Sequence, residues 1–347
     1  MTRQINVGGV LIGGGAPVTV QSMTTLPPSD IKGTLTQIHA LEVAGCDIVR
    51  VAIPDLLSAQ AIAEIKPRIS IPLVADIHFD YKLALASVEA GVDKIRINPG
   101  NIGSETNVRA VADACRERKI PIRVGVNGGS LERELLEKHG GVTDKALAES
   151  ALGQVRLLER LGFEDICISA KASDVMTTVG AYRELARLCD YPLHVGVTET
   201  GTEFGGLIRS AAGIGSLLIG GIGDTLRVSL TAPPEREVTA GLELLRSLGL
   251  RAGGARMISC PTCGRCNYDL FAVAGEVEQR LSTLPPERSV TVAVMGCAVN
   301  GPGEARAADF GIAGGRGEGI LFARGEIIGK APQDGLVDAL FALIEKG

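Results

Sequence analysis

Four of the eight cysteines lie close together near the C-terminal end of the chain. Cys260, Cys263 and Cys266 follow one another at intervals of three residues in SCPTCGRC, and Cys297 follows in MGCAVNGPGEA. Two thiolates separated by two residues in a turn can bind one metal centre. The spacing leaves two metals open, a structural zinc bound by all four cysteines or an iron-sulfur cluster with three thiolates and a weaker fourth ligand. Zinc ribbons usually have a second CxxC at the distant position, where this chain has only Cys297, so the spacing favours iron-sulfur.

The other four cysteines, Cys46, Cys115, Cys167 and Cys189, are scattered singly among apolar or helical residues. A cytosolic chain keeps its thiols reduced, so we expect no disulfide framework. We interpret these four as small hydrophobic residues of the core.

A second group of residues with chemical potential consists of arginines placed between aliphatic neighbours in IVRVA, KIRIN, PIRVG and TLRVS. They are Arg50, Arg96, Arg123 and Arg227, and Lys171 closes a fifth such run, DICISAK. Side chains alternate along a strand, so the aliphatic flanks and the cations face opposite sides, and a buried guanidinium requires an anion.

The anion could come from the protein, through a buried ionic layer with Asp76, Glu199 and Glu203. Five cations outnumber these carboxylates, and guanidinium groups match phosphate oxygens in geometry. We therefore predict a diphosphate or similarly polyanionic small substrate, with Asn98 and Asn127 adding neutral hydrogen bonds.

Other polar features near the expected strand ends carry weaker signals. His78 and His194 lie there, but a lone histidine is as often structural as catalytic, and we assign them no role. The glycine-rich segment at 205–215 is expected to be a loop-to-helix joint rather than a phosphate-binding helix N-terminus.

The elements that position these residues repeat along the chain. Eight β-branched runs alternate with segments of helical periodicity, which predicts parallel strands with right-handed crossovers and favours a (β/α)8 TIM barrel. The runs span 18–23, 47–53, 71–77, 93–99, 120–126, 165–171, 192–198 and 224–230. The preceding INVGGVLIGG predicts a hairpin at the barrel floor.

The pattern changes after residue 252. We predict a helix over 268–281, a strand over 290–296, a hairpin over 318–331 and a final helix over 333–347. The chain is thus expected to be α/β, with a TIM-barrel domain at 1–252 and a small α+β domain at 253–347.

Composition excludes some classes of partner. With 35 basic and 40 acidic residues, a net charge of -5 and no basic run, nucleic acid is not expected as a partner. The N-terminus lacks the apolar core of a signal peptide, and no apolar run is long enough to span a membrane. We expect a cytoplasmic protein without a membrane partner.

Taken together, SCPTCGR, VMGCAVNGPGEA, IRINPGN, IRVGVN and GIGDTLRVSL closely resemble the 4-hydroxy-3-methylbut-2-enyl diphosphate synthase family of the non-mevalonate isoprenoid pathway. The resemblance covers essentially the whole chain and fits the two-domain bacterial form. It implies an iron-sulfur oxidoreductase that converts 2-C-methyl-D-erythritol 2,4-cyclodiphosphate to the allylic diphosphate by reductive ring opening and loss of water. It also implies reduced flavodoxin or ferredoxin as electron donor, and a homodimer in which the cluster domain of one subunit covers the barrel mouth of the other.

The resemblance implies roles for individual residues. The ligands of a 4Fe-4S cluster would be Cys260, Cys263, Cys297 and Glu304, while Cys266 would be a bystander. Glu199 would be an acidic group near the substrate and a proton donor, and Glu304 would take part in catalysis as a displaceable ligand. The residues implied in diphosphate binding are Arg50, Arg96, Asn98, Arg123, Asn127, Lys171, Arg227 and Ser229.

Two alternatives stay open at this point. One is a barrel transferase or lyase acting on a phosphorylated metabolite, with zinc holding the C-terminal module together. The other is a non-catalytic iron-sulfur carrier, against which the five lumen cations argue.

Overall fold

The computed structural model describes residues 1–346 except 286–287, 298–302 and 304. The chain forms two compact units, Met1–Arg251 and Ala252–Gly347. In the described part of the chain, no helix is long and apolar enough to cross a membrane.

The first unit is built on eight parallel strands, each hydrogen-bonded to its neighbours in the order β8-β7-β6-β5-β4-β3-β10-β9. A parallel bridge between Ile168 and Leu193 joins the two ends of this sheet, so the strands close into a barrel. The strands are β3 (Thr19–Met23), β4 (Ile48–Ala52), β5 (Leu73–Asp76), β6 (Lys94–Ile97), β7 (Ile122–Asn127), β8 (Ile166–Lys171), β9 (His194–Val195) and β10 (Thr225–Leu226). Seven of them lie within predicted runs, β7 extends one residue past its run to Asn127, and β9 and β10 are shorter than expected.

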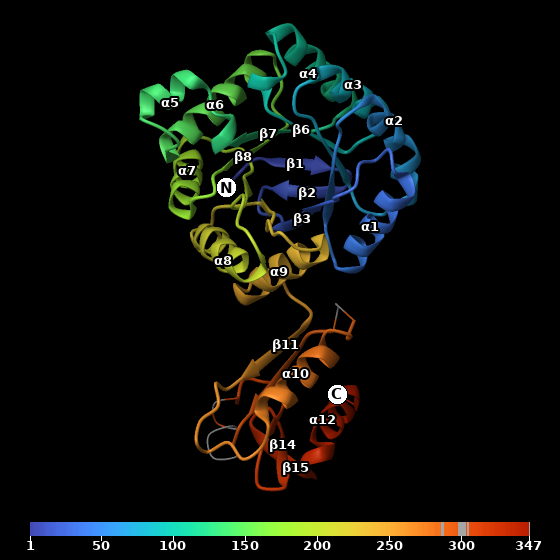
Figure 1. Ribbon diagram of the computed structural model, residues 1–347, viewed down its shortest axis with the longest axis vertical. Coiled ribbons are helices and arrows are strands. Elements are labelled where there is room, and N and C mark those ends of the chain that lie inside the picture. Colours follow the sequence, from blue (N-terminus) through green and yellow to red (C-terminus); the bar gives the residue numbers. More distant parts are fainter. Residues whose placement is uncertain (286–287, 298–302, 304, 347) are drawn as a thin grey trace. The chain divides into compact units, whose positions relative to one another are not determined.

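Helices surround the barrel strands (Figure 1). They are α1 (Ile31–Val43), α2 (Leu56–Ile65), α3 (Tyr81–Glu89), α4 (Glu105–Arg118), α5 (Arg133–His139), α6 (Asp144–Arg160), α7 (Val175–Leu188), α8 (Glu203–Ile219) and α9 (Pro234–Ser247). Several begin at an aspartate whose carboxylate accepts a backbone N–H of the first turn, as Asp30 and Asp55 do. The aliphatic neighbours of the strand arginines, such as Ile95 and Ile97 beside Arg96, are buried in the barrel's main hydrophobic core. The predicted alternation is therefore confirmed.

The expectation for residues 205–215 was wrong, because this segment lies inside α8. Its glycines permit close packing of the helix. A Cβ on Gly206 would stand 2.5 Å from Leu230 Cδ2, and one on Gly213 would stand 2.5 Å from Val197 Cγ2. The glycines therefore serve helix packing, a role that sequence spacing does not distinguish from a loop.

The predicted N-terminal hairpin is present as β1 (Gln4–Val7) and β2 (Val10–Gly13), which pair in antiparallel register. Ile5, Val7 and Ile12 are buried in one cluster with Ile48 and Val74, which lie near the amino ends of β4 and β5. The hairpin thus closes the barrel floor with apolar side chains.

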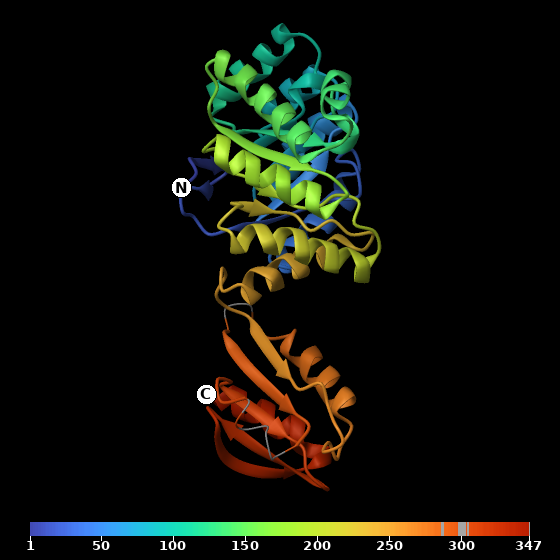
Figure 2. The same ribbon diagram turned by 90° about the vertical axis from the view of Figure 1, so that its left-hand side faces the viewer.

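The second unit is a five-stranded sheet in sequential order, with β11, β12 and β13 parallel and β13, β14 and β15 antiparallel. The strands are β11 (Ala255–Ser259), β12 (Val290–Met295), β13 (Phe310–Ala313), β14 (Glu318–Ala323) and β15 (Glu326–Pro332). Helices α10 (Leu270–Leu281) and α12 (Leu336–Lys346) lie against the sheet in Figure 2. Val277 and Leu340 from these helices share a core with Val292 of β12.

Two strands of this sheet, β11 and β13, were not predicted from the sequence. Both are short and lie next to glycines, and β11 carries Arg256 among its five residues. Pairing with the strongly apolar β12 fixes them as strands, which is a tertiary effect that local pattern does not contain.

Candidate active site

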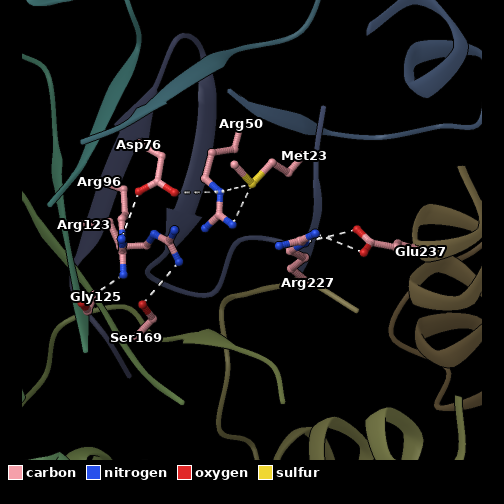
Figure 3. Close-up of polar contacts among 9 residues, drawn as sticks. All are labelled: Met23, Arg50, Asp76, Arg96, Arg123, Gly125, Ser169, Arg227 and Glu237. Carbon is pink, nitrogen blue, oxygen red and sulfur yellow. Dashed lines mark hydrogen bonds and ion pairs between the residues drawn. The ribbon is translucent and has the colours of Figure 1, made fainter. Parts of the chain in front are cut away.

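A cavity of about 260 Å³ opens toward the carboxyl ends of the barrel strands. Of the described residues that line it, five are the predicted cations, and one, Asp76, is a carboxylate. Figure 3 shows the four arginines and the polar groups that they contact. Of the eight residues implied in substrate binding, seven line this cavity: Arg50, Arg96, Arg123, Asn127, Lys171, Arg227 and Ser229.

Asp76, the last residue of β5, lies between two of the arginines (Figure 3). Arg96 Nη1 is 3.0 Å from Asp76 Oδ1, and Arg50 Nε is 3.7 Å from Asp76 Oδ2. Burial acts to raise the pKa of Asp76, but the positive charges of Arg50, Arg96 and Arg123 outweigh it and lower this pKa to about 2. Asp76 is therefore ionised at neutral pH and compensates part of the positive charge.

Arg227, which follows β10, is held by a carboxylate from outside the strand ring. Arg227 Nε donates to Glu237 Oε2 at 3.1 Å and Nη2 donates to Oε1 at 3.0 Å, a bidentate pair. Glu237 lies on α9, is 2% exposed, and also accepts hydrogen bonds from Ser22 Oγ and from the backbone N–H of Leu230. This pairing fixes the orientation of the Arg227 guanidinium.

Among the five cations that line the cavity, Arg123 has the most buried nitrogens without a hydrogen-bond partner. It is 1% exposed, and its Nη1 donates to Ser169 Oγ at 3.2 Å. Its Nε and Nη2, like Nε of Arg96, have no hydrogen-bond partner in the described structure. Burial and the neighbouring charge of Arg96 lower the pKa of Arg123 to about 10, so it stays cationic at neutral pH. Buried unpaired donors are costly, and an anion in the cavity would satisfy them.

Two glycines make room for cations. A Cβ on Gly125 would stand 2.4 Å from Arg96 Nε, and the carbonyl of Gly125 accepts from Arg96 Nη2 at 3.1 Å. A Cβ on Gly196 would stand 2.7 Å from Lys171 Nζ. Burial, followed by the charges of neighbouring arginines, lowers the pKa of Lys171 well below its usual value.

A buried polar layer made by Gln21, Lys94 and His194 lies in the barrel interior, and each of these residues is 0% exposed. Lys94 Nζ, His194 Nε2 and both side-chain polar atoms of Gln21 have no partner among the described residues. Burial, together with Arg123 and Arg50, lowers the pKa of Lys94 to about 8. Burial and the charge of Lys171 lower the pKa of His194 well below its usual value, so that its ring is neutral.

Three residues singled out in the sequence lie apart from the cavity lining. Asn98 is 4% exposed, and its Oδ1 accepts the Gly100 N–H at 3.1 Å, so it shapes the loop after β6. Glu199 is exposed and has a left-handed backbone with φ of 55° in the loop after β9. Glu203 pairs with Arg236 at the surface and is not part of a buried ionic layer.

Sequence reasoning gave no role to Met23, Ser169, Val197 and Thr198, which line the cavity, or to Glu237, which pairs with Arg227. Arg50 Nε and Nη2 lie 3.1 and 3.0 Å from Met23 Sδ. The strand alternation could have found Met23 and Ser169, which stand at inward positions of predicted runs. His78, left without a role, also lines the cavity.

In the second unit, the cysteine loop lies beside the end of β12. Cys260 Sγ accepts the Gly296 N–H at 3.2 Å, and Cys297 follows Gly296 directly. Cys263 is exposed, whereas the other three are half-buried. Within the described ranges, no group of three histidine, cysteine or carboxylate side chains is arranged to hold a metal ion. Glu304 lies outside the described residues, so the predicted ligand set stays a prediction.

The singly placed cysteines of the barrel behave as expected. Cys46, Cys115 and Cys167 are buried, and Cys189 is half-buried. Burial raises the pKa of the Cys46 and Cys115 thiols to about 12. These thiols are therefore unreactive members of the core.

A closed eight-stranded barrel with a cationic cavity at the carboxyl ends of its strands defines a TIM-barrel enzyme. Family comparisons extend this conclusion. The GcpE TIM-barrel domain matches residues 2–242, and the GcpE protein C-terminal domain matches residues 256–346. The chain belongs to the GcpE family.

Curated relatives support the same assignment. The chain is 59% identical over 345 residues to 4-hydroxy-3-methylbut-2-en-1-yl diphosphate synthase (flavodoxin) from Geobacter sulfurreducens, covering 99% of this chain and 97% of that protein. It is 56% identical to the enzyme of the same name from Shouchella clausii, covering 99% and 94%. The predicted family, barrel fold and oxidoreductase class are confirmed, and the transferase or lyase alternative is not favoured.

Among solved structures, dihydropteroate synthase from Stenotrophomonas maltophilia matches 72% of this chain and 97% of its own, with a TM-score of 0.51 and 14% identity. This likeness concerns the barrel fold alone.

Proposed function

We propose that the enzyme converts 2-C-methyl-D-erythritol 2,4-cyclodiphosphate to 4-hydroxy-3-methylbut-2-enyl diphosphate by reductive ring opening and loss of water. The observation that carries the proposal is the cavity, whose described lining has five cations against one carboxylate. Residues 1–252 would bind the substrate and residues 253–347 would hold the cluster. The names of the relatives support this reaction product.

The cations divide the work of binding the diphosphate. Arg123 presents two unpaired nitrogens and Arg96 presents one, which suits the oxygens of a phosphate group. Glu237 already holds Arg227 in one orientation, so Nη1 of Arg227 can bind the substrate with little further loss of conformational entropy. Arg50 and Lys171 add charge, and Asn127 and Ser229 add hydrogen bonds, while Asn98 assists by shaping the loop after β6.

Proton delivery is the task that we assign to Glu199. The reaction takes up two electrons and releases one oxygen as water, so protons must reach the reacting group. Glu199 lies in the loop after β9, close in sequence to Val197 and Thr198, which line the cavity. Its exposed position in a left-handed turn is compatible with a carboxylate that reaches the substrate when the site is closed.

A 4Fe-4S cluster would be held by Cys260, Cys263, Cys297 and Glu304. The donor set fits, because three soft thiolates bind iron firmly and one carboxylate is more easily displaced. The hydrogen bond from the Gly296 N–H to Cys260 Sγ is the kind that stabilises a ligating thiolate. The cluster supplies electrons one at a time. Cys266 is not assigned as a ligand.

Reduced flavodoxin is the electron donor suggested by the relatives' names, and ferredoxin is the alternative. We also propose that the enzyme is cytoplasmic.

A homodimer in which a partner's cluster domain covers the barrel mouth is supported by apolar exposure. Large apolar side chains stand exposed after the carboxyl ends of six barrel strands: Leu26, Leu56, Leu57, Phe79, Val142, Met176, Phe204 and Ile208. Exposed apolar side chains in the segments that follow the strand ends are suited to burial against a protein surface. Covering them would exclude water from the reacting substrate.

The decisive experiment is an anaerobic assay with the cyclodiphosphate and an artificial one-electron donor, on protein analysed for iron, acid-labile sulfide and zinc. We expect brown protein with iron and sulfide, and formation of the allylic diphosphate. Colourless protein with stoichiometric zinc would overturn the redox function.

Three variants test the ligands. Glu304→Ala should keep a cluster with altered spectroscopy and little turnover, and unchanged turnover would reject Glu304 as a ligand. Cys297→Ser should lose iron while Cys266→Ser keeps it, and the reverse result would exchange their roles.

A further inference from the structure

Tyr268 connects the cysteine loop to the strand that leads into Cys297. It lies between the SCPTCGRC segment and α10, and its hydroxyl donates to the carbonyl oxygen of Met295 at 2.8 Å. Met295 is the last residue of β12, is 3% exposed, and is followed by Gly296 and Cys297. A single side chain therefore joins two segments that are far apart in sequence but both carry predicted cluster ligands.

The aromatic ring of Tyr268 is fixed by a matching glycine. A Cβ on Gly314 would stand 2.0 Å from two ring carbons, so a side chain at that position and the ring exclude each other. The Gly314 N–H donates to the same Met295 oxygen, at 2.9 Å. Both lone pairs of the Met295 oxygen are thus used, one by the Gly314 N–H and one by the Tyr268 hydroxyl.

The loop itself is fastened at the same place. Cys266 Sγ donates to the carbonyl of Tyr268 at 3.2 Å, and the Cys266 N–H donates to the carbonyl of Cys263 at 2.9 Å. Cys260 and Cys266 sulfurs lie 3.4 and 3.1 Å from the place where a Cβ on Gly296 would stand. The loop is therefore closed against the end of β12 at both of its ends, and Cys263 stands exposed between them.

We propose that Tyr268 is a positioning residue for the cluster, which fixes the Cys260–Cys266 loop to the strand end that carries Cys297. Ordering a free loop costs backbone conformational entropy at every residue that becomes fixed. When the loop is already fastened, this entropy is lost during folding. Cluster binding is then more favourable, because it does not have to order the loop. The inference rests on the proposed iron-sulfur function and adds a residue that supports the ligands without binding iron.

The first test compares Tyr268→Phe and Tyr268→Ala with the wild-type chain after anaerobic reconstitution. Tyr268→Phe keeps the ring on Gly314 but loses the hydrogen bond, so we expect near-normal iron and sulfide and a several-fold faster loss of the cluster to a chelator. Tyr268→Ala should retain less than half of the iron. The matched control is Tyr182→Phe, which removes a hydroxyl that donates to the His194 carbonyl in the barrel and should leave cluster loss unchanged.

The second test uses the contact between the ring and Gly314. Gly314→Ala should lower iron retention, because its methyl group would displace the ring, although it removes no group from the cysteine loop. Combined with Tyr268→Ala, it should cause little further loss, since the clash is gone. Additive losses would overturn the assigned role.

The outcomes separate the two proposals. If the reconstituted wild-type chain holds neither iron nor sulfide, the proposed function fails. If it holds a cluster and both Tyr268 variants retain and lose it as the wild type does, the role of Tyr268 fails and the function stands. Circular dichroism of each cluster-free variant checks that the sheet is folded, and Tyr268→Phe decides the question if Tyr268→Ala does not fold.

Discussion

Glu237 on helix α9 accepts hydrogen bonds from both Nε and Nη2 of Arg227, at 3.1 and 3.0 Å. The carboxylate is buried, whereas one nitrogen of the guanidinium is left for other contacts. The orientation of Arg227, which we propose as a substrate contact, thus depends on a residue outside the cavity lining.

Glu237→Gln should weaken substrate binding. The neutral amide keeps the shape but loses the charge and one acceptor of the bidentate pair, so we expect KM to rise roughly tenfold, equivalent to about 1.4 kcal/mol, with a smaller change in kcat. Steady-state kinetics measure both. Glu203→Gln is the control, because its partner Arg236 lies at the surface, and an equal effect of the two variants would contradict the prediction.

Asp76→Asn should destabilise the barrel, because it leaves the buried Arg50 and Arg96 without their carboxylate. We expect a loss of roughly 3 kcal/mol at pH 7 by urea denaturation, partly restored by inorganic pyrophosphate. The pKa of Asp76 is about 2 in the folded state, below its value of about 3.9 in the unfolded chain. Its contribution is therefore present above pH 4 and lost as the pH falls toward 2, so the variant and the wild type should converge in acid.

Gly125→Ala should displace Arg96, because the added methyl group would stand 2.4 Å from Arg96 Nε. We expect binding of pyrophosphate, measured by calorimetry, to weaken at least tenfold while the barrel stays folded. Gly129→Ala is the matched control, since a Cβ there would meet nothing within 4 Å. Equal affinity in the two variants would mean that Arg96 finds another position with the same access to the anion.

Lys94→Met should stabilise the protein. The pKa of Lys94 is about 8 in the folded chain and about 10.4 when unfolded, so keeping its proton below pH 8 costs about 3 kcal/mol. Between pH 8 and pH 10.4 the unfolded state binds more protons, and wild-type stability should rise. The advantage of the variant should therefore be largest at pH 7 and fade by pH 10, measured by urea denaturation against the exposed-site control Lys32→Met. A difference that does not change with pH would show that Lys94 does not titrate in this range.

Much of the barrel could be predicted from the sequence, because each strand carries its own local signal. Aliphatic residues on both sides of Arg50, Arg96, Arg123 and Arg227 mark inward cations, and seven of the eight predicted substrate residues line one cavity. Positions in the sequence were enough to predict that these residues come together, because a parallel barrel brings the carboxyl ends of its strands to one rim.

Other parts of the site could not be predicted, since they depend on contacts between distant segments. The pairing of Glu237 with Arg227 depends on how α9 packs against the barrel. The residues around Glu237 in the sequence give no sign of this packing. Asn98 lies apart from the cavity lining, because a residue near a strand end can use its polar atoms in hydrogen bonds within its own loop. In the second unit, the short strand β13 is defined by its neighbours rather than by its composition.

The apolar hairpin of β1 and β2 has a consequence for the order of events in a catalytic cycle. Ile5, Val7 and Ile12 pack across the amino ends of the barrel strands. Substrate, product and released water must therefore share one route, at the carboxyl ends. Substrate binding and product release must then occur one after the other. A product diphosphate bound in the cavity would exclude the next substrate, so we expect the product to inhibit competitively.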